Sequence, residues 1–163
     1  MKISKLDLEP TAIDFLTSEG FEKLYEPQAY SVDAGILDGK SVLVSAPTAS
    51  GKTLIAMLAM LSYLSKNKGK VIYLSPLRAL AAEKFAEFKK LEKINLGRKI
   101  KVGISTGDFD SVEDKLENSD ILVLTNEKMD ALMRLGQSWI SEIGLVIVAV
   151  SYTHLTLPTI LLV

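Results

Sequence analysis

The sequence predicts an α/β fold with three layers, in which helices cover both faces of a doubly wound parallel sheet. Short apolar runs recur along the chain, at residues 41–45, 71–74, 121–124 and 145–148, with a weaker candidate at 100–104. These runs are continuous rather than alternating, which is typical of strands that are covered on both faces. Helical patterns separate them, and alternation of strand and helix favours a parallel sheet.

The predicted helices follow the same order. The clearest covers residues 52–66, where Leu54, Ile55, Leu58 and Leu61 share one face. Weaker patterns cover residues 77–91 and 127–135. Upstream, helices are expected at 10–18 and 27–37; each begins near a proline, and the second ends at Asp38-Gly39.

Composition limits the possible functions. The chain has 163 residues, enough for one domain with a core, and 48% are hydrophobic and 24% charged, as in ordinary globular proteins. It has no cysteine and only His154, which argues against disulfides and a zinc site. The first residues hold no long apolar stretch, so we expect a cytoplasmic protein without a membrane span. The net charge of −1 argues mildly against bulk electrostatic binding of nucleic acid.

A phosphate-binding loop is predicted between the first apolar run and the helix at 52–66. Its residues are Ala46, Pro47, Thr48, Ala49, Ser50, Gly51, Lys52 and Thr53. Backbone N–H groups of such a loop bind the phosphates of ATP, Lys52 places a charge on the transferred phosphate, and the Thr53 hydroxyl binds Mg²⁺. Ala46 and Ala49 stand where glycine is usual. The alternative is a glycine turn before a helix that carries an exposed lysine.

Four further segments resemble the superfamily 2 helicases, most closely the archaeal fork-repair DNA helicases related to the Ski-type enzymes. The segments are Tyr25-Glu26-Pro27-Gln28, Ser75-Pro76-Leu77-Arg78-Ala79-Leu80-Ala81, Ser105-Thr106-Gly107-Asp108 and Thr125-Asn126-Glu127-Lys128. They occur in the family's order and approximate spacing, and the resemblance covers about residues 1–148. It implies a RecA-like P-loop ATPase domain.

The resemblance also implies roles for single residues. Gln28 reads the adenine base, because a side-chain amide offers both a donor and an acceptor. Arg78, Thr106, Gly107 and Thr125 contact the phosphates of a nucleic-acid strand, expected to be single-stranded or forked DNA, without reading its sequence. The acidic residues of these segments suit helix caps, whereas Lys128 is open to either role.

The sequence departs from the family at the fourth apolar run. There the family continues with Asp-Glu-x-His, whose acids hold Mg²⁺ and orient the attacking water, but this chain continues with Ala149-Val150-Ser151-Tyr152. The second motor domain and its arginine finger are also missing. We therefore expect the isolated chain not to hydrolyse ATP at a useful rate.

Three segments are expected from these patterns: a helical segment with the adenine motif at 1–38, an incomplete ATPase domain at 39–148, and a tail at 149–163. The tail resembles translated sequencing adapter and has no clear period, so we expect it to be non-native and extended. Three functions are considered: the amino-terminal motor domain of an ATP-dependent DNA helicase, a module that binds ATP and nucleic acid without hydrolysis, and a P-loop ATPase or kinase unrelated to nucleic acid.

Overall fold

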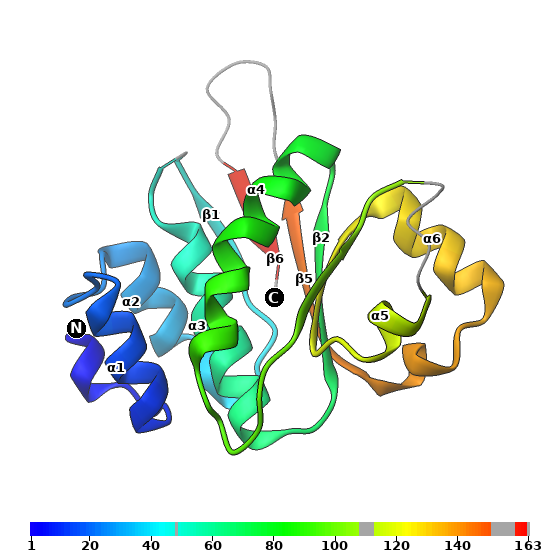
Figure 1. The fold of residues 1–163 in the computed structure, drawn as a ribbon. Helices are drawn as coiled ribbons and strands as arrows, with labels where there is room; N and C mark the ends of the chain where they lie inside the picture. Colours follow the sequence, from blue (N-terminus) through cyan, green and yellow to red (C-terminus); the bar gives the residue numbers. More distant parts are fainter. Residues whose placement is uncertain (48, 108–112, 151–158, 163) are drawn as a thin grey trace.

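The computed structural model describes residues 1–47, 49–107, 113–150 and 159–162. Within these ranges six strands form one sheet in the order β1-β6-β5-β2-β4-β3 (Figure 1). The strands are β1 Leu43–Ala46, β2 Lys70–Ser75, β3 Val102–Ser105, β4 Ile121–Thr125, β5 Ile143–Val150 and β6 Thr159–Leu162. The α-helices are α1 Pro10–Ser18, α2 Glu26–Asp33, α3 Lys52–Lys66, α4 Arg78–Lys89, α5 Glu113–Glu117 and α6 Asn126–Leu135. Short 3-10 helices lie at Ile3–Lys5, Ile36–Asp38, Lys90–Lys93 and Ser138–Glu142.

The centre of the sheet is parallel, as predicted. β2 pairs in parallel with β4 and β5, and β3 pairs in parallel with β4. The exception is β6, which lies between β1 and β5 and pairs antiparallel with both. The sequence did not indicate this strand, although it did predict an extended tail; residues 151–158 and 163 lie outside the described part of the chain.

Two apolar clusters on opposite faces of the sheet confirm the three-layer architecture. In β2, Val71 and Tyr73 pack with residues of α1 to α4, while Ile72 packs with Leu132 of α6 on the other face. Figure 1 shows α1 to α4 on one side of the sheet and α5 and α6 on the other. The continuous apolar runs are thus explained by burial on both faces.

Aromatic packing anchors α4 to the sheet. The rings of Tyr73 in β2 and Phe88 in α4 meet edge to face with centroids 5.0 Å apart. Phe88 and Ala81 are fully buried, so the stripe that joins them faces the core. Lys84 lies between these two residues on that stripe.

One helix prediction was wrong at its end. The helix expected at 27–37 ends at Asp33 as α2, and Ile36–Asp38 forms a separate 3-10 turn. Gly35 causes the break, because its φ of 95° is left-handed and cannot continue a right-handed helix. The predicted bounds of α1 and α3 are confirmed exactly, whereas α5 was not predicted.

The segments singled out in the sequence come together at one edge. β1, β2, β3 and β4 each run directly into one of these segments, at Ala46, Ser75, Ser105 and Thr125. β1 is separated from the others by β5 and β6, but the strand pairings give it the same direction as β2, β3 and β4, so all four end at the same side of the sheet. This is the edge at which open α/β sheets bind their ligands.

Candidate nucleotide site

The loop between β1 and α3 has the backbone geometry of an anion-binding turn. Ala49 and Gly51 are both left-handed, with φ of 63° and 77°, and α3 begins directly at Lys52. Left-handed residues beside a helix start direct N–H groups toward a common point, where they bind anions. The left-handed φ of Gly51 favours glycine, and a Cβ added there would lie 2.2 Å from the Gln28 amide nitrogen, so the Gln28 side chain would have to shift. Thr48 lies outside the described residues.

Lys52 folds back over this loop. Its ammonium donates to the carbonyl oxygens of Ala46 and Pro47, at 2.7 and 2.5 Å, and to the Ser50 hydroxyl at 3.2 Å. Partial burial lowers the pKa of Lys52 from its ordinary value. Among the described residues no carboxylate forms an ion pair with it. The partners that the described residues give this charge are therefore neutral oxygens, which a phosphate can replace.

Thr53 has a partner that the sequence did not reveal. Its hydroxyl oxygen accepts a hydrogen bond of 2.9 Å from the ammonium of Lys84. Lys84 also pairs with Glu87 at 2.9 Å and with Glu83 at 3.4 Å. The predicted magnesium ligand is thus hydrogen-bonded to the middle of α4.

Gln28 lies against the loop but is almost fully buried, with 2% of its surface exposed. Its amide oxygen accepts from the Tyr25 N–H at 2.8 Å, which closes the capping box of α2, and its amide nitrogen donates to the Gly51 carbonyl at 3.1 Å. Tyr25 itself is 71% exposed. Gln28 therefore joins α2 to the phosphate loop, and the predicted adenine contact stays a prediction.

The residues predicted to contact nucleic acid differ in their surroundings. Arg78 is the first residue of α4 and is exposed. Thr106 and Gly107 are partly exposed, and the Gly107 carbonyl accepts a hydrogen bond of 2.9 Å from the Lys128 ammonium. Thr125 is only 2% exposed and caps α6, accepting from the Lys128 N–H at 3.3 Å.

Lys128 therefore joins the loop after β3 to the start of α6. These bonds favour a structural role for Lys128 over a contact with phosphate. The buried Thr125 hydroxyl holds the backbone of Lys128 in the same place, because it accepts a hydrogen bond from the Lys128 N–H. Asp108, expected to cap a helix, lies outside the described residues, whereas Glu127 does occupy the first turn of α6.

The donor set suits phosphate and a weakly held cation. The loop offers N–H groups and one ammonium, and Thr53 offers a single hydroxyl oxygen for Mg²⁺. In the part of the chain that the structure describes, no three acidic or histidine side chains converge on a possible metal position. Ala149 and Val150, which stand where the family has its acids, are residues of β5. Most of the magnesium ligands would have to come from phosphate and water.

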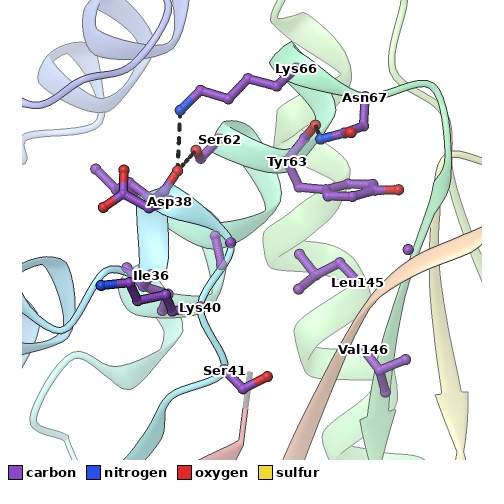
Figure 2. Close-up of a pocket in the computed structure, with 14 residues that line it drawn as sticks. Ile36, Asp38, Lys40, Ser41, Ser62, Tyr63, Lys66, Asn67, Leu145 and Val146 are labelled. Carbon is purple, nitrogen blue, oxygen red and sulfur yellow. Dashed lines mark hydrogen bonds between the residues drawn. The ribbon is translucent and has the colours of Figure 1, made fainter.

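The cavity shown in Figure 2 lies away from this loop, at the opposite edge of the sheet. It has a volume of about 570 Å³ and lies between the segment before β1, the end of α3 and the start of β5. Ser62 and Lys66 both donate to the Leu37 carbonyl at its rim, at 2.7 and 3.2 Å. None of the predicted site residues lines it.

Comparison with known proteins identifies relatives. The profile of the DEAD/DEAH box helicase family matches residues 25–149. The ATP-dependent DNA helicase Hel308 of Methanocella arvoryzae is 47% identical over 156 residues, and that of Pyrococcus abyssi is 43% identical over 148 residues. These alignments cover 95% and 91% of this chain but 21% and 20% of the relatives, so the chain spans about a fifth of their length.

Solved structures agree on the fold. The DUF1998 helicase MrfA, crystallised with DNA and AMPPNP, superposes with a TM-score of 0.73 and 25% identity, over 86% of this chain and 20% of that one. A hypothetical ATP-dependent RNA helicase from Sulfolobus tokodaii gives 0.72 at 24% identity, over 86% of this chain and 41% of that one. Among the described helices, none is long and apolar enough to cross a bilayer.

Proposed function

We propose, because the chain belongs to the DEAD/DEAH box helicase family, that it is the ATP-binding motor domain of a DNA helicase. In this proposal the loop at 46–53 holds the triphosphate of ATP, Thr53 ligates Mg²⁺ and Gln28 lies on the adenine side. Arg78 and the loops after β3 and β4 contact a nucleic-acid strand. In the whole protein a second motor domain completes the cycle of ATP hydrolysis and unwinding.

The observation that carries the proposal is the Lys52 ammonium in the phosphate loop. It is partly desolvated, it has no acidic partner among the described residues, and it is bonded to loop carbonyls at the helix N-terminus. A lysine at the positive end of a helix is unfavourable by itself, because its charge repels the helix dipole. An anion bound at this point relieves that repulsion, and a triphosphate is the anion that the family uses.

Arg78 supports the nucleic-acid half of the proposal. It is a cation at the first position of α4, where the helix dipole again disfavours positive charge, and the first turn contains no acid. Bound phosphate would be stabilised there by both the guanidinium and the helix N-terminus. Relatives named as DNA helicases favour DNA as the strand.

A second function, binding of ATP and a strand without hydrolysis, is favoured by one specific feature. Ala149 and Val150 are apolar strand residues at the positions of the family's two acids. Without those carboxylates the attacking water has no general base or orienting group. We therefore expect this chain to bind Mg²⁺-ATP and to turn it over slowly at best.

Titration of the 163-residue chain with a fluorescent ATP analogue in Mg²⁺ tests the proposal. Anisotropy of a labelled single-stranded DNA, with and without the analogue, tests the strand contact, and phosphate release tests turnover. Saturable nucleotide and strand binding without strand-stimulated turnover is the expected result. Binding of neither ligand would overturn the proposal, and brisk turnover would overturn the expected loss of hydrolysis.

A further inference from the structure

Lys84 has an unusual position for a lysine. It lies on the core-facing stripe of α4, between Ala81 and Phe88, which are both fully buried. Its side chain is only 17% exposed. Because burying an ammonium is costly without partners, the contacts that it makes determine where it can stay.

Those contacts reach across to the phosphate loop. The ammonium donates to the Thr53 hydroxyl at 2.9 Å and to the Glu87 carboxylate at 2.9 Å, and Glu83 lies at 3.4 Å. Thr53 is the second residue of α3, so the bond joins α3 to α4 directly. On one side Lys84 has a neutral oxygen at the nucleotide site, and on the other it has two carboxylates of its own helix.

From this geometry we infer that Lys84 is a positioning residue that competes with Mg²⁺ for the Thr53 hydroxyl. The inference rests on the proposed function, because it assigns the ion to the same hydroxyl. A cation coordinated by the Thr53 oxygen would stand close to the ammonium that donates to that oxygen, and two positive charges at this separation repel. Binding of the ion therefore breaks the bond between Lys84 and Thr53, and the ammonium keeps its ion pairs with Glu83 and Glu87. Because both carboxylates belong to α4, the helix does not have to move.

The charge of Lys84 has a second effect of the same sign. Without the divalent ion, a positive charge beside Thr53 favours a triphosphate bound in the loop, and with the ion the same charge opposes the metal. Lys84 thus reduces the ratio between the dissociation constants of ATP measured without and with Mg²⁺. Removing the charge raises this ratio, whichever of the two effects is larger.

Lys84→Met tests the inference, because methionine retains most of the side chain's length and apolar contact while removing the charge. The readout is the dissociation constant of a fluorescent ATP analogue for the 163-residue chain, measured in EDTA and in excess Mg²⁺. The ratio of the two constants is expected to rise about fivefold, the size of a charge-assisted hydrogen bond at a partly exposed site. Lys84→Arg keeps the charge and should leave the ratio near that of the parent.

Lys89→Met is the matched control. Lys89 lies on the same helix with the same charge, but it is half exposed and pairs with Glu92 at 2.6 Å, away from Thr53. The ratio should not change in this variant. In a Thr53→Ala background the part of the Lys84→Met effect that arises from competition for the hydroxyl should disappear, because the shared oxygen is gone, and only the effect of the Lys84 charge at a distance should remain.

Other outcomes would contradict the inference. If Lys84→Met weakens binding equally with and without Mg²⁺, Lys84 only holds α3 and α4 together, and the inference is overturned. An unchanged ratio in a variant that folds, judged by its unfolding midpoint, also overturns it while leaving the proposed function intact. Failure of the parent chain to bind the analogue in either buffer overturns the proposed function, and the inference with it.

Discussion

The two ends of the strands each hold a lysine that donates to backbone carbonyls, and the comparison separates the lysine proposed to bind phosphate from a structural one. Lys52 begins α3 at the carboxyl end of β1, and its ammonium donates to the carbonyls of Ala46 and Pro47. Lys70 begins β2 at the opposite edge, and its ammonium donates to the Ser119 carbonyl at 2.7 Å and to that of Glu117. By contacts alone the two lysines look alike.

They differ in the charges that surround them. Burial lowers the pKa of both, but at Lys70 the carboxylates of Glu142 and Asp120 act against this shift and stabilise the ammonium. At Lys52 burial is the only cause of the shift within the described residues. Lys70 therefore has its counter-charges within the protein, whereas Lys52 lacks one among the described residues. A lysine without an internal counter-charge can instead form an ion pair with a bound anion.

The same comparison shows that the volume of a cavity does not indicate where the candidate nucleotide site lies. The cavity of about 570 Å³ lies at the edge of the sheet that holds Lys70, where Tyr63 and Leu145 line it (Figure 2). The phosphate loop is an open turn instead. A triphosphate is bound by N–H groups and charge on an exposed loop, so the chemistry of the donors is more informative here than the size of the hollow.

The largest effect is expected for loss of the Lys52 charge. Lys52→Ala should weaken binding of a fluorescent ATP analogue by about tenfold or more, because a charge-assisted hydrogen bond to phosphate is removed. Lys70→Met, at the other edge, should leave the affinity of the folded protein within about twofold. Equal affinity of Lys52→Ala and the parent would remove Lys52 from the site and break the comparison.

The free energy of unfolding should respond in the opposite way to the affinity, with the larger loss at Lys70 and the smaller loss at Lys52. Lys70 is 5% exposed, so Lys70→Met leaves two carbonyl groups unsatisfied and should lower the free energy of unfolding by about 2–3 kcal/mol. Lys52→Met should change it by only about 0.5 kcal/mol, because the loop carbonyls can bind water instead. Urea unfolding of both variants measures the difference. Similar losses at the two sites would show that Lys52 is as structural as Lys70.

The sequence predicted the sheet well because its strands are buried on both faces. Continuous apolar runs need no knowledge of the partner strand, so β2, β4 and β5 were evident. β6 was missed because its antiparallel position between β1 and β5 depends on tertiary pairing, not on a local period. The end of α2 was misplaced because a glycine inside a helical pattern is compatible with either helix or turn until its φ is known.

The candidate site could be predicted from the sequence only in part, for a similar reason. Gly51, Lys52 and Thr53 are adjacent in sequence, so their loop was recognisable as a motif. Lys84 is 31 residues from Thr53, and their contact arises only when α3 and α4 pack on the same face of the sheet. Its place on an apolar stripe, between Ala81 and Phe88, was the one available signal.

A smaller loss of stability is expected at Gly51. Gly51→Ala combines a left-handed φ of 77° with a Cβ that would lie 2.2 Å from the Gln28 amide, and should cost about 1–2 kcal/mol or more. Gly136→Ala is the control, since its φ of 66° is similar but no atom lies within 4 Å of the added Cβ. The difference between their urea midpoints isolates the contact between loop and α2. Equal losses would show that Gln28 moves away freely.

The smallest effect concerns selection of the base by Gln28. A side-chain amide has two donor hydrogens and two acceptor lone pairs, and the bonds to the Tyr25 N–H and the Gly51 carbonyl use one of each. Among the described residues one donor and one acceptor remain, which is the pair that the N7 and N6 edge of adenine requires. ATP should therefore compete with the fluorescent analogue about threefold to fivefold better than GTP, a preference smaller than that of a fully exposed amide because Gln28 is 2% exposed.

In Gln28→Ala the inhibition constants of ATP and GTP should converge. This change also removes the bond to Gly51, so some loss of affinity for both nucleotides is expected, and only the ratio between them reports on the base. Gln137→Ala, a glutamine outside the loop that precedes the 3-10 turn at Ser138–Glu142, should keep the ratio of the parent. A parent chain that binds ATP and GTP equally would show that the remaining donor and acceptor do not reach a base. Gln28 would then act only as the link between α2 and the loop, as its two hydrogen bonds already allow.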